Sequence, residues 1–262
     1  MPITAFINLR ALSAGPVSRS FHCLMHPVFL DRISKADPAM SKSLHDAGMM
    51  TPFSLSPVMG ADKKIVENES YRVRIGILND ELEKAFTDTL EKGVWREPVR
   101  LEEHLFQVED VVLGTQKGNQ WSGKASYQDM IFGSSDSRKI SLSVASPLSF
   151  KRGDLHYPLP EPALIFGNLS RRWNLFAPFR LPENIGCENV SYSYLNIRSV
   201  PFLLRKGGTI FGITGKLTFV SDGPPEERLY YHALLRFAFY SGIGVKTTQG
   251  MGMCRILPER DS

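Results

Sequence analysis

The segment Ser241-Gly-Ile-Gly-Val-Lys-Thr-Thr-Gln-Gly-Met-Gly-Met253 places four glycines within eleven residues. It follows an aromatic, amphipathic segment with helical spacing and precedes a short apolar segment typical of a strand. Glycine permits positive φ angles and a close approach of the main chain to a ligand, so successive N–H groups can converge on an anion. The sequence therefore predicts a phosphate-binding loop. Its predicted binding residues are Gly242, Gly244, Lys246, Thr247, Thr248, Gly250 and Gly252.

Two common nucleotide-binding motifs do not fit this loop. A mononucleotide P-loop has Gly-Lys-Ser/Thr at the start of a helix, whereas Lys246 follows Val245 and the helix precedes the loop. A dinucleotide fingerprint would need glycine where Thr247 stands. ATP and NAD are therefore not indicated, and a glycine-rich turn without a ligand is the alternative interpretation.

Hydrophobic periodicity around the loop predicts the order β-α-β-β-α-β for the second half of the chain. The expected elements are a strand at 139–146, a helix at 163–176, strands at 191–198 and 212–219, a helix at 226–240 and a strand at 253–257. In the last helix, Tyr230, Ala233, Leu234, Phe237 and Ser241 share one face.

The first half of the chain predicts a similar order. The expected elements are a strand at 3–9, helices at 17–33 and 38–45, strands at 53–58 and 71–78, a helix to residue 90 capped by Asn79-Asp80 with Glu83, and strands at 99–113 and 125–132. The predicted fold class is α+β, with tandem ferredoxin-like (RRM-like, βαββαβ) domains at 1–135 and 136–262. A polar linker at 133–138 separates them.

Composition limits the class of protein. With 262 residues, 42% of them hydrophobic, the chain can bury two ordinary cores. The three cysteines, Cys23, Cys187 and Cys254, are scattered and odd in number, which argues against a disulfide framework. We find no export signal at the N-terminus and no apolar stretch of about 20 residues. We therefore expect a cytoplasmic protein that does not span a membrane.

Charge is distributed unevenly between the two halves. Residues 1–137 contain 15 Lys/Arg and 18 Asp/Glu, whereas residues 138–262 contain 16 and 9, so the formal charges are −3 and +7. A basic second half indicates that contacts with a polyanion lie there.

The predicted fold, ending in helix, glycine loop and strand, resembles the RAMP superfamily of CRISPR-associated proteins. The resemblance is closer still to the endoribonucleases that process CRISPR repeat RNA. Two further blocks match: Leu44-His45-Asp46 followed by Pro52-Phe-Ser-Leu-Ser-Pro57, and Ser146-Pro-Leu-Ser-Phe150 followed by Leu169-x-x-Arg-Trp173-Asn174. Together with the loop they span most of the chain.

The resemblance implies metal-independent cleavage of a repeat transcript, with no cofactor. The ribose 2′-hydroxyl would attack the adjacent phosphate and leave a 2′,3′-cyclic phosphate and a 5′-hydroxyl. Histidine suits both proton transfers because its unperturbed pKa is about 6.5. The predicted catalytic residues are His45 in the matching block, His26 late in the first long helix, and Lys42, three residues before His45, for charge stabilisation. A structural histidine is the alternative for each ring.

Some family members place a tyrosine and a lysine beside the histidine, but residues 20–50 contain no tyrosine. This absence favours a two-histidine mechanism. His22 and His26 have the spacing of a zinc-binding pair, yet the glutamate of the zincin motif is absent and no third ligand is evident. We therefore predict no metal site.

Three further groups of cations are predicted RNA contacts. Arg228, His232 and Arg236 recur at every fourth position of the last helix, where a solvated helix face is the alternative. Arg171 and Arg172 precede Trp173, for which core packing is the alternative. Arg205 and Lys206 lie in the turn of a predicted hairpin at 199–213, which could insert at the base of an RNA stem.

Repeat RNA is the expected partner, and a CRISPR effector complex and a second copy of the chain are further candidates. One alternative function is a RAMP subunit that binds guide RNA without cleaving it. Another is a small-molecule enzyme on a ferredoxin-like scaffold, which is disfavoured because no metal-cluster, nucleotide or activated Ser/Cys motif is found.

Overall fold

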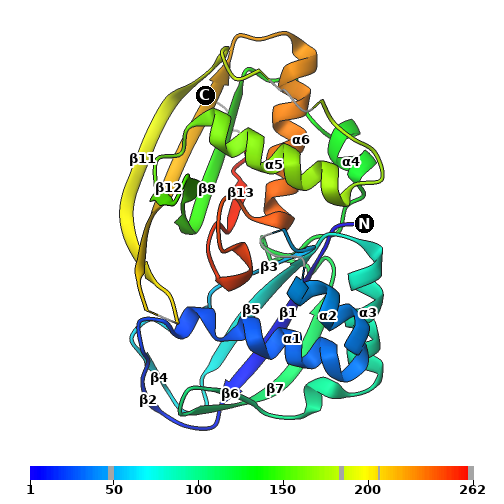
Figure 1. Cartoon of the computed structure of the whole chain (residues 1–262), viewed down its shortest axis with the longest axis vertical. Coiled ribbons are helices and arrows are strands. Elements are labelled where there is room, and N and C mark those ends of the chain that lie inside the picture. Colours follow the sequence, from blue (N-terminus) through cyan, green and yellow to red (C-terminus); the bar gives the residue numbers. More distant parts are fainter. Residues whose placement is uncertain (47–49, 183–185, 206, 259–262) are drawn as a thin grey trace.

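Two antiparallel sheets, one from each half of the chain, form two lobes stacked along the long axis of the molecule (Figure 1). The computed structural model describes residues 1–46, 50–182, 186–205 and 207–258. None of the helices in these ranges combines the length and the hydropathy that a membrane crossing requires.

The first sheet has the strand order β3-β5-β1-β7-β6. Helices α1 and α3 lie against one face, α2 packs on α1, and the short strands β2 and β4 pair separately (Figure 1). The order β1-α1-β3-β5-α3-β7 is a split β-α-β pair, as in a ferredoxin-like fold. The elements are β1 (Ile3–Ala11), β2 (Gly15–Pro16), α1 (Met25–Ala36), α2 (Pro38–Asp46), β3 (Phe53–Leu55), β4 (Lys64–Ile65), β5 (Ser70–Ile77), α3 (Asp80–Glu91), β6 (Val99–Leu101) and β7 (His104–Leu113), with 3-10 turns η1 (Phe21–Cys23) and η2 (Val94–Arg96).

The second sheet has the order β11-β12-β8-β13, with α5 and α6 on one face (Figure 1). This sheet repeats the β-α-β-β-α-β order, so the predicted fold class, α+β with tandem ferredoxin-like domains, is confirmed. The elements are α4 (Tyr127–Phe132), β8 (Lys139–Leu148), β9 (Phe150–Arg152), β10 (Leu155–Tyr157), α5 (Pro162–Phe176), β11 (Val190–Leu203), β12 (Thr209–Ser221), α6 (Pro225–Ser241), η3 (Thr247–Gln249) and β13 (Cys254–Ile256).

Four local predictions differ from the structure. The single strand predicted at 99–113 is two paired strands, β6 and β7, joined by a turn at Glu102-Glu103. Helix α1 begins at Met25 rather than near residue 17, because a turn at 19–20 and η1 precede it. The strand predicted at 125–132 is wrong, since these residues contain helix α4, which a reciprocal Ser126–Asp129 capping box begins. At α3 the predicted N-cap is present, since the Asn79 side chain accepts a hydrogen bond from the Leu82 N–H. The Glu83 carboxylate does not form the capping box predicted for it and instead accepts a hydrogen bond from Lys124 at 3.2 Å.

Each lobe has its own apolar core. The predicted division between residues 135 and 136 falls between α4 and β8. Tyr127 and Met130 of α4 nevertheless pack in the second core, together with the fully buried Trp173. Helix α6 buries more than the one face predicted for it, because its last turn also meets the first lobe.

That last turn fixes the two lobes relative to each other. The Ser54 hydroxyl donates to the main-chain oxygen of Tyr240 at 2.6 Å, and the Arg74 guanidinium donates to the oxygens of Phe239 and Trp121 at 2.6 and 2.7 Å. Arg74 is only 2% exposed, and this burial lowers its pKa to about 10. At Gly76 any Cβ would lie 2.0 Å from the Tyr240 oxygen, so β5 and α6 are in main-chain contact.

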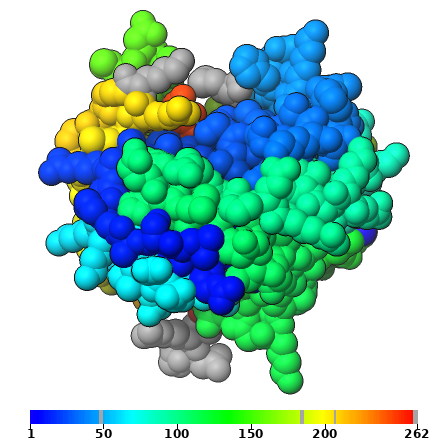
Figure 2. Space-filling model, turned by 90° about the horizontal axis from the view of Figure 1, so that it is seen from below, coloured from blue at the N-terminus to red at the C-terminus, as the bar shows by residue number. Residues whose placement is uncertain are grey.

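A second contact joins the lobes at the tip of the long β11–β12 hairpin. Cys23 of η1 packs there with Phe202, Ile210 and Met251, and its thiol donates to the Leu203 oxygen at 3.5 Å. Seen from below, the tip of this hairpin lies against the first helical turns of the N-terminal lobe (Figure 2). The predicted hairpin at 199–213 is therefore confirmed as the end of a longer one.

Candidate RNA-binding and catalytic cavity

A cavity of about 690 Å³ opens where α1, α2 and the residues before β3 face α5 and the glycine loop. It brings together His26, His45 and the glycine loop, which lie far apart in the sequence. None of the described residues that line it is Asp or Glu. The charged or titratable side chains that line it are His26, His45, Lys151, His156, Arg171, Arg172 and Lys246. Such a cavity favours an anionic ligand.

His26 on α1 is held by both lobes. Its Nδ1 atom lies 3.1 Å from the main-chain oxygen of Thr248, and its ring stacks on Phe53 with centroids 5.9 Å apart. A carbonyl oxygen only accepts, so Nδ1 carries the proton and Nε2 is the free acceptor. Burial lowers the pKa of His26, and the nearby charges of Lys246 and His45 lower it further.

His45 lies in the last turn of α2 and lines the cavity. Its side chain is 82% exposed, and its Nδ1 atom lies 3.5 Å from a carboxylate oxygen of Asp46. Lys42 lies one turn earlier on α2, exposed and outside the set of residues that line the cavity. The structure thus brings His26 and His45 to the same cavity but not Lys42.

The glycine loop is folded largely on itself and on the end of β8. The N–H groups of Ile243, Gly244, Val245 and Gly252 donate to Gly252, Asn168, Ser149 and Pro147, respectively, at 2.9–3.0 Å. All four glycines have positive φ, and a Cβ at Gly244 or Gly252 would lie 2.2 or 2.0 Å from a main-chain oxygen. The glycines are therefore required by the loop's own packing, and these N–H groups are not free to bind an anion. The loop also lines the cavity, through Lys246, Thr247, Thr248 and Gln249.

The adjacent arginines Arg171 and Arg172 are in different environments. Arg171 is exposed and lines the cavity. Arg172 is 4% exposed and donates to the Ser241 oxygen, to the Thr247 hydroxyl at 3.0 Å and to the Thr51 oxygen at 3.5 Å. Its pKa is lowered to about 10 by burial. Arg172 therefore ties the loop and α6 to the first lobe, which corrects its predicted direct contact with RNA.

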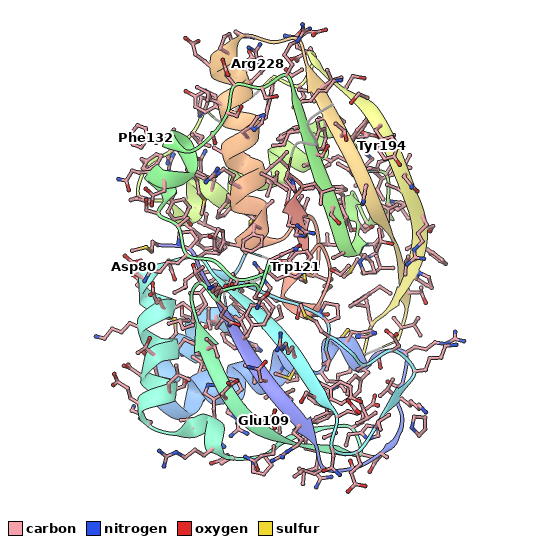
Figure 3. The ribbon with its side chains drawn as sticks, turned by 180° about the vertical axis from the view of Figure 1, so that it is seen from behind. Asp80, Glu109, Trp121, Phe132, Tyr194 and Arg228 are labelled. Carbon is pink, nitrogen blue, oxygen red and sulfur yellow. The ribbon has the colours of Figure 1, made fainter. Side chains whose placement is uncertain are left out.

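The predicted basic stripe on α6 does not reach the cavity. Arg228 donates to the Asp136 and Gly223 oxygens, and Arg236 to that of Gly133 at 2.6 Å. His232 is buried, with Nε2 3.1 Å from the Ser137 oxygen. Arg228 lies at the end of α6 far from the glycine loop (Figure 3). These three side chains hold the linker, contrary to the expected path toward the loop.

The remaining predicted residues lie at the edge of the cavity or outside it. Arg205 is exposed beside Leu204, which lines the cavity, whereas Lys206 lies outside the described residues. His22 belongs to η1 rather than to α1, so it does not share a helix face with His26, and burial lowers its pKa. Within the described ranges, no group of three His, Cys, Asp or Glu side chains is arranged to bind a metal.

Two further cavity residues, Lys151 and His156 on the β9–β10 hairpin, were not predicted from the sequence. The signal was present, because Gly153-Asp154 between two short extended segments is typical of a two-residue turn. Asn168, whose side-chain oxygen accepts from the Gly244 N–H at 2.9 Å, was also missed.

Comparison with known proteins adds to this geometry. Residues 142–254 match the family model described as CRISPR-associated endoribonuclease Cas6. The CRISPR-associated endoribonuclease Cas6 of Mycobacterium tuberculosis is 29% identical over 128 residues, which is 47% of this chain and 40% of that protein. The chain thus spans less than half the length of this curated relative.

Solved structures match over nearly the whole chain. A Cas6 product complex is 29% identical with a TM-score of 0.79, and the match covers 98% of this chain and 99% of that one. A second Cas6 product complex is 25% identical with a TM-score of 0.83, covering 98% and 100%.

The tandem ferredoxin-like fold is similar to that of these solved Cas6 structures. Over residues 142–254 the chain is also similar in sequence to the family described as CRISPR-associated endoribonuclease Cas6.

Proposed function

We propose that the chain is a metal-independent endoribonuclease that cleaves CRISPR repeat RNA by attack of a ribose 2′-hydroxyl on the adjacent phosphate. The observation that carries the proposal is the cavity lined by His26, His45 and the glycine loop, in which none of the described lining residues is acidic. The names of the relatives support it, since they are CRISPR-associated endoribonucleases, and solved Cas6 structures include complexes with product and with a substrate mimic. One of those structures is of a histidine-to-alanine mutant.

His26 is the general base in this proposal. Its Nδ1 proton is directed to the Thr248 oxygen, which leaves Nε2 to accept the proton of the 2′-hydroxyl. Because burial lowers its pKa below 6.5, the ring is neutral at pH 7 and competent as a base.

His45 is the general acid. Its exposed position at the mouth of the cavity lets it donate to the leaving 5′-oxygen and regain a proton from water. Lys246 takes the charge-stabilising role first given to Lys42, because it lines the cavity and its charge acts on His26.

The wider organisation follows from these roles. Residues 1–135 supply the histidines, and residues 136–262 supply the loop and most of the cations that hold the RNA. We also predict that the protein assembles with an effector complex or pairs with a second copy, and that it is located in the cytoplasm.

The test is cleavage of the cognate repeat RNA by the purified protein in excess EDTA. We expect cutting at one linkage, with a 2′,3′-cyclic phosphate and a 5′-hydroxyl identified by mass spectrometry. An RNA with one 2′-deoxy nucleotide at that linkage should bind equally well and remain intact. Cutting that requires a divalent metal, or products with 5′-phosphates, would refute the mechanism. Tight binding without cutting would support the guide-RNA-binding alternative.

A further inference from the structure

Besides His26, His45 and the glycine loop, the cavity is lined by residues of a small hairpin and of α5. Lys151 on β9 and His156 on β10 are directly opposite each other in the pairing register, and both line the cavity. Arg171 on α5 lines it as well. We call these three exposed side chains the hairpin wall.

None of the ion pairs in the described ranges involves a side chain of the hairpin wall, although Arg171 also lines a second pocket that contains Glu161 and Glu188. Arg152, on the other face of the hairpin, pairs with Glu161 at 2.7 Å and lies over the Tyr157 ring at 4.2 Å. Lys151, His156 and Arg171 have no acidic partner in this part of the chain. Asp154, the one acidic residue of the hairpin, lies in its turn and does not line the cavity. Lys151 carries an ammonium group and His156 a ring N–H at directly opposite positions, so one anion between them can accept hydrogen bonds from both.

The hairpin is fixed relative to the glycine loop. Ser149, next to β9, accepts from the Val245 N–H at 2.9 Å, and the side chain of Phe150 is 4% exposed in the second core. On its outer side, the Tyr157 hydroxyl donates to Glu161 at the start of α5. The wall is therefore a preformed surface at a set position from His26, which already contacts the loop through Thr248.

We propose that the hairpin wall is a second phosphate subsite, which binds an RNA phosphate beside the scissile linkage and so directs the strand across the histidines. This inference rests on the proposed function, since it names a part of the same substrate. Lys151 and His156 bind the phosphate from the two strands, and Arg171 binds it from α5.

The test measures equilibrium binding of uncleavable repeat RNA, 2′-deoxy at the scissile nucleotide, across a range of salt. Lys151→Ala, His156→Ala and Arg171→Ala are compared with Lys84→Ala and Arg100→Ala, exposed residues of α3 and β6. We expect each wall variant to bind about three- to tenfold more weakly, and Lys151→Ala and Arg171→Ala each to lower the salt slope by about 0.7. The controls should match the wild type.

Neutral methylphosphonate linkages locate the contact. A methylphosphonate at the phosphate that contacts the wall removes the negative charge to which Lys151 binds. Wild type and Lys151→Ala should therefore bind that RNA with equal affinity. Wall variants that match the controls, or a loss that is the same for every methylphosphonate position, would overturn the subsite. A wall variant that binds normally but cuts more than 100-fold more slowly at saturation would also overturn it.

The outcomes separate the two proposals. If the wild type cuts RNA and the wall variants bind like the controls, the subsite is wrong and the proposed function stands. If the wild type binds without cutting and the wall variants lose affinity, the subsite stands and the cleavage function falls.

Discussion

The imidazole Nδ1 atom of His26 lies 3.1 Å from the main-chain oxygen of Thr248, so a ring on the first lobe is oriented by the glycine loop of the second. This single contact sets the tautomer of the ring and joins the proposed base to the loop. The proposed chemistry therefore depends on the relative position of the lobes, and each prediction below tests one part of that dependence.

The pH dependence of cleavage should report the lowered pKa of His26. Burial is the main cause of the lowering, and Lys246 adds to it. We expect the acidic limb of the single-turnover rate to have its midpoint below pH 6.5, and Lys246→Ala to move it to higher pH by less than about one unit. An NMR titration of His26 should likewise give a lower pKa in the wild type than in Lys246→Ala. A midpoint that Lys246→Ala leaves unchanged, or moves to lower pH, would contradict this assignment.

The pH dependence of stability should also reflect the lowered pKa of His26. A folded-state pKa below 6.5 means that the unfolded chain binds the proton more readily, so stability falls as the pH is lowered from 6.5 toward the folded pKa. Urea unfolding should show this loss in the wild type and a smaller loss in His26→Gln. Equal losses in both proteins would show that His26 is not the group responsible.

Arg171 and Arg172 should separate affinity from stability. Arg172→Ala removes a buried charge that donates to Ser241, Thr247 and Thr51, and we expect a loss of about 3 kcal/mol in the free energy of unfolding. Arg171→Ala should change it by less than about 0.5 kcal/mol and weaken RNA binding instead. The comparison uses urea unfolding and RNA titration on both variants, and equal stabilities would show that Arg172 is not a structural tie.

Gly252 should be far less tolerant than Gly208, although both have positive φ. An alanine Cβ at Gly252 would lie 2.0 Å from the Ile243 oxygen, whereas at Gly208 no atom lies within 4 Å. Gly208→Ala should cost about 1–2 kcal/mol through its backbone conformation alone. Gly252→Ala should cost clearly more and reduce cleavage, because the loop must rearrange. Similar losses in thermal or urea unfolding would mean that φ strain, and not packing, explains both glycines.

Gly76→Ala tests the lobe contact itself. The new methyl group would lie 2.0 Å from the Tyr240 oxygen and would push α6 away from β5. A displacement of about 1 Å can cost 100-fold in rate, so we expect a large loss of cleavage. Gly118→Ala, where nothing lies within 4 Å and only the positive φ opposes alanine, is the control for RNA cleavage. If Gly76→Ala cuts like this control, the relative position of the lobes is not critical.

Hydrophobic periodicity was enough to predict the two ferredoxin-like units, because their strands and long helices each bury one regular face. It was not enough for α4, since six residues are too few for helical spacing to be distinguished from a strand. The Ser126–Asp129 capping box was the better signal. The short β9–β10 hairpin was missed for the same reason, and Lys151 and His156 with it.

The candidate site could be predicted only in part. The sequence identified His26, His45 and the glycine loop, but it could not show that the glycines serve main-chain packing or that Arg172 is buried beside the exposed Arg171. Regular spacing on α6 did not reveal that Arg228 and Arg236 bond to linker oxygens. The bonds of Arg172 to Ser241, of Arg228 to Asp136 and of Arg236 to Gly133 join residues 69, 92 and 103 positions apart, and such contacts cannot be read from one sequence.

The most direct measurement of the central claim uses a repeat RNA whose leaving 5′-oxygen is replaced by sulfur, a leaving group that needs no general acid. On ordinary RNA, His45→Ala and His26→Ala should each lower the single-turnover rate by about 100- to 10,000-fold at unchanged affinity. On the sulfur-substituted RNA, His45→Ala should recover most of the wild-type rate and His26→Ala should not. If both variants cut ordinary RNA at the wild-type rate, the two histidines do not move the protons, and the account is wrong.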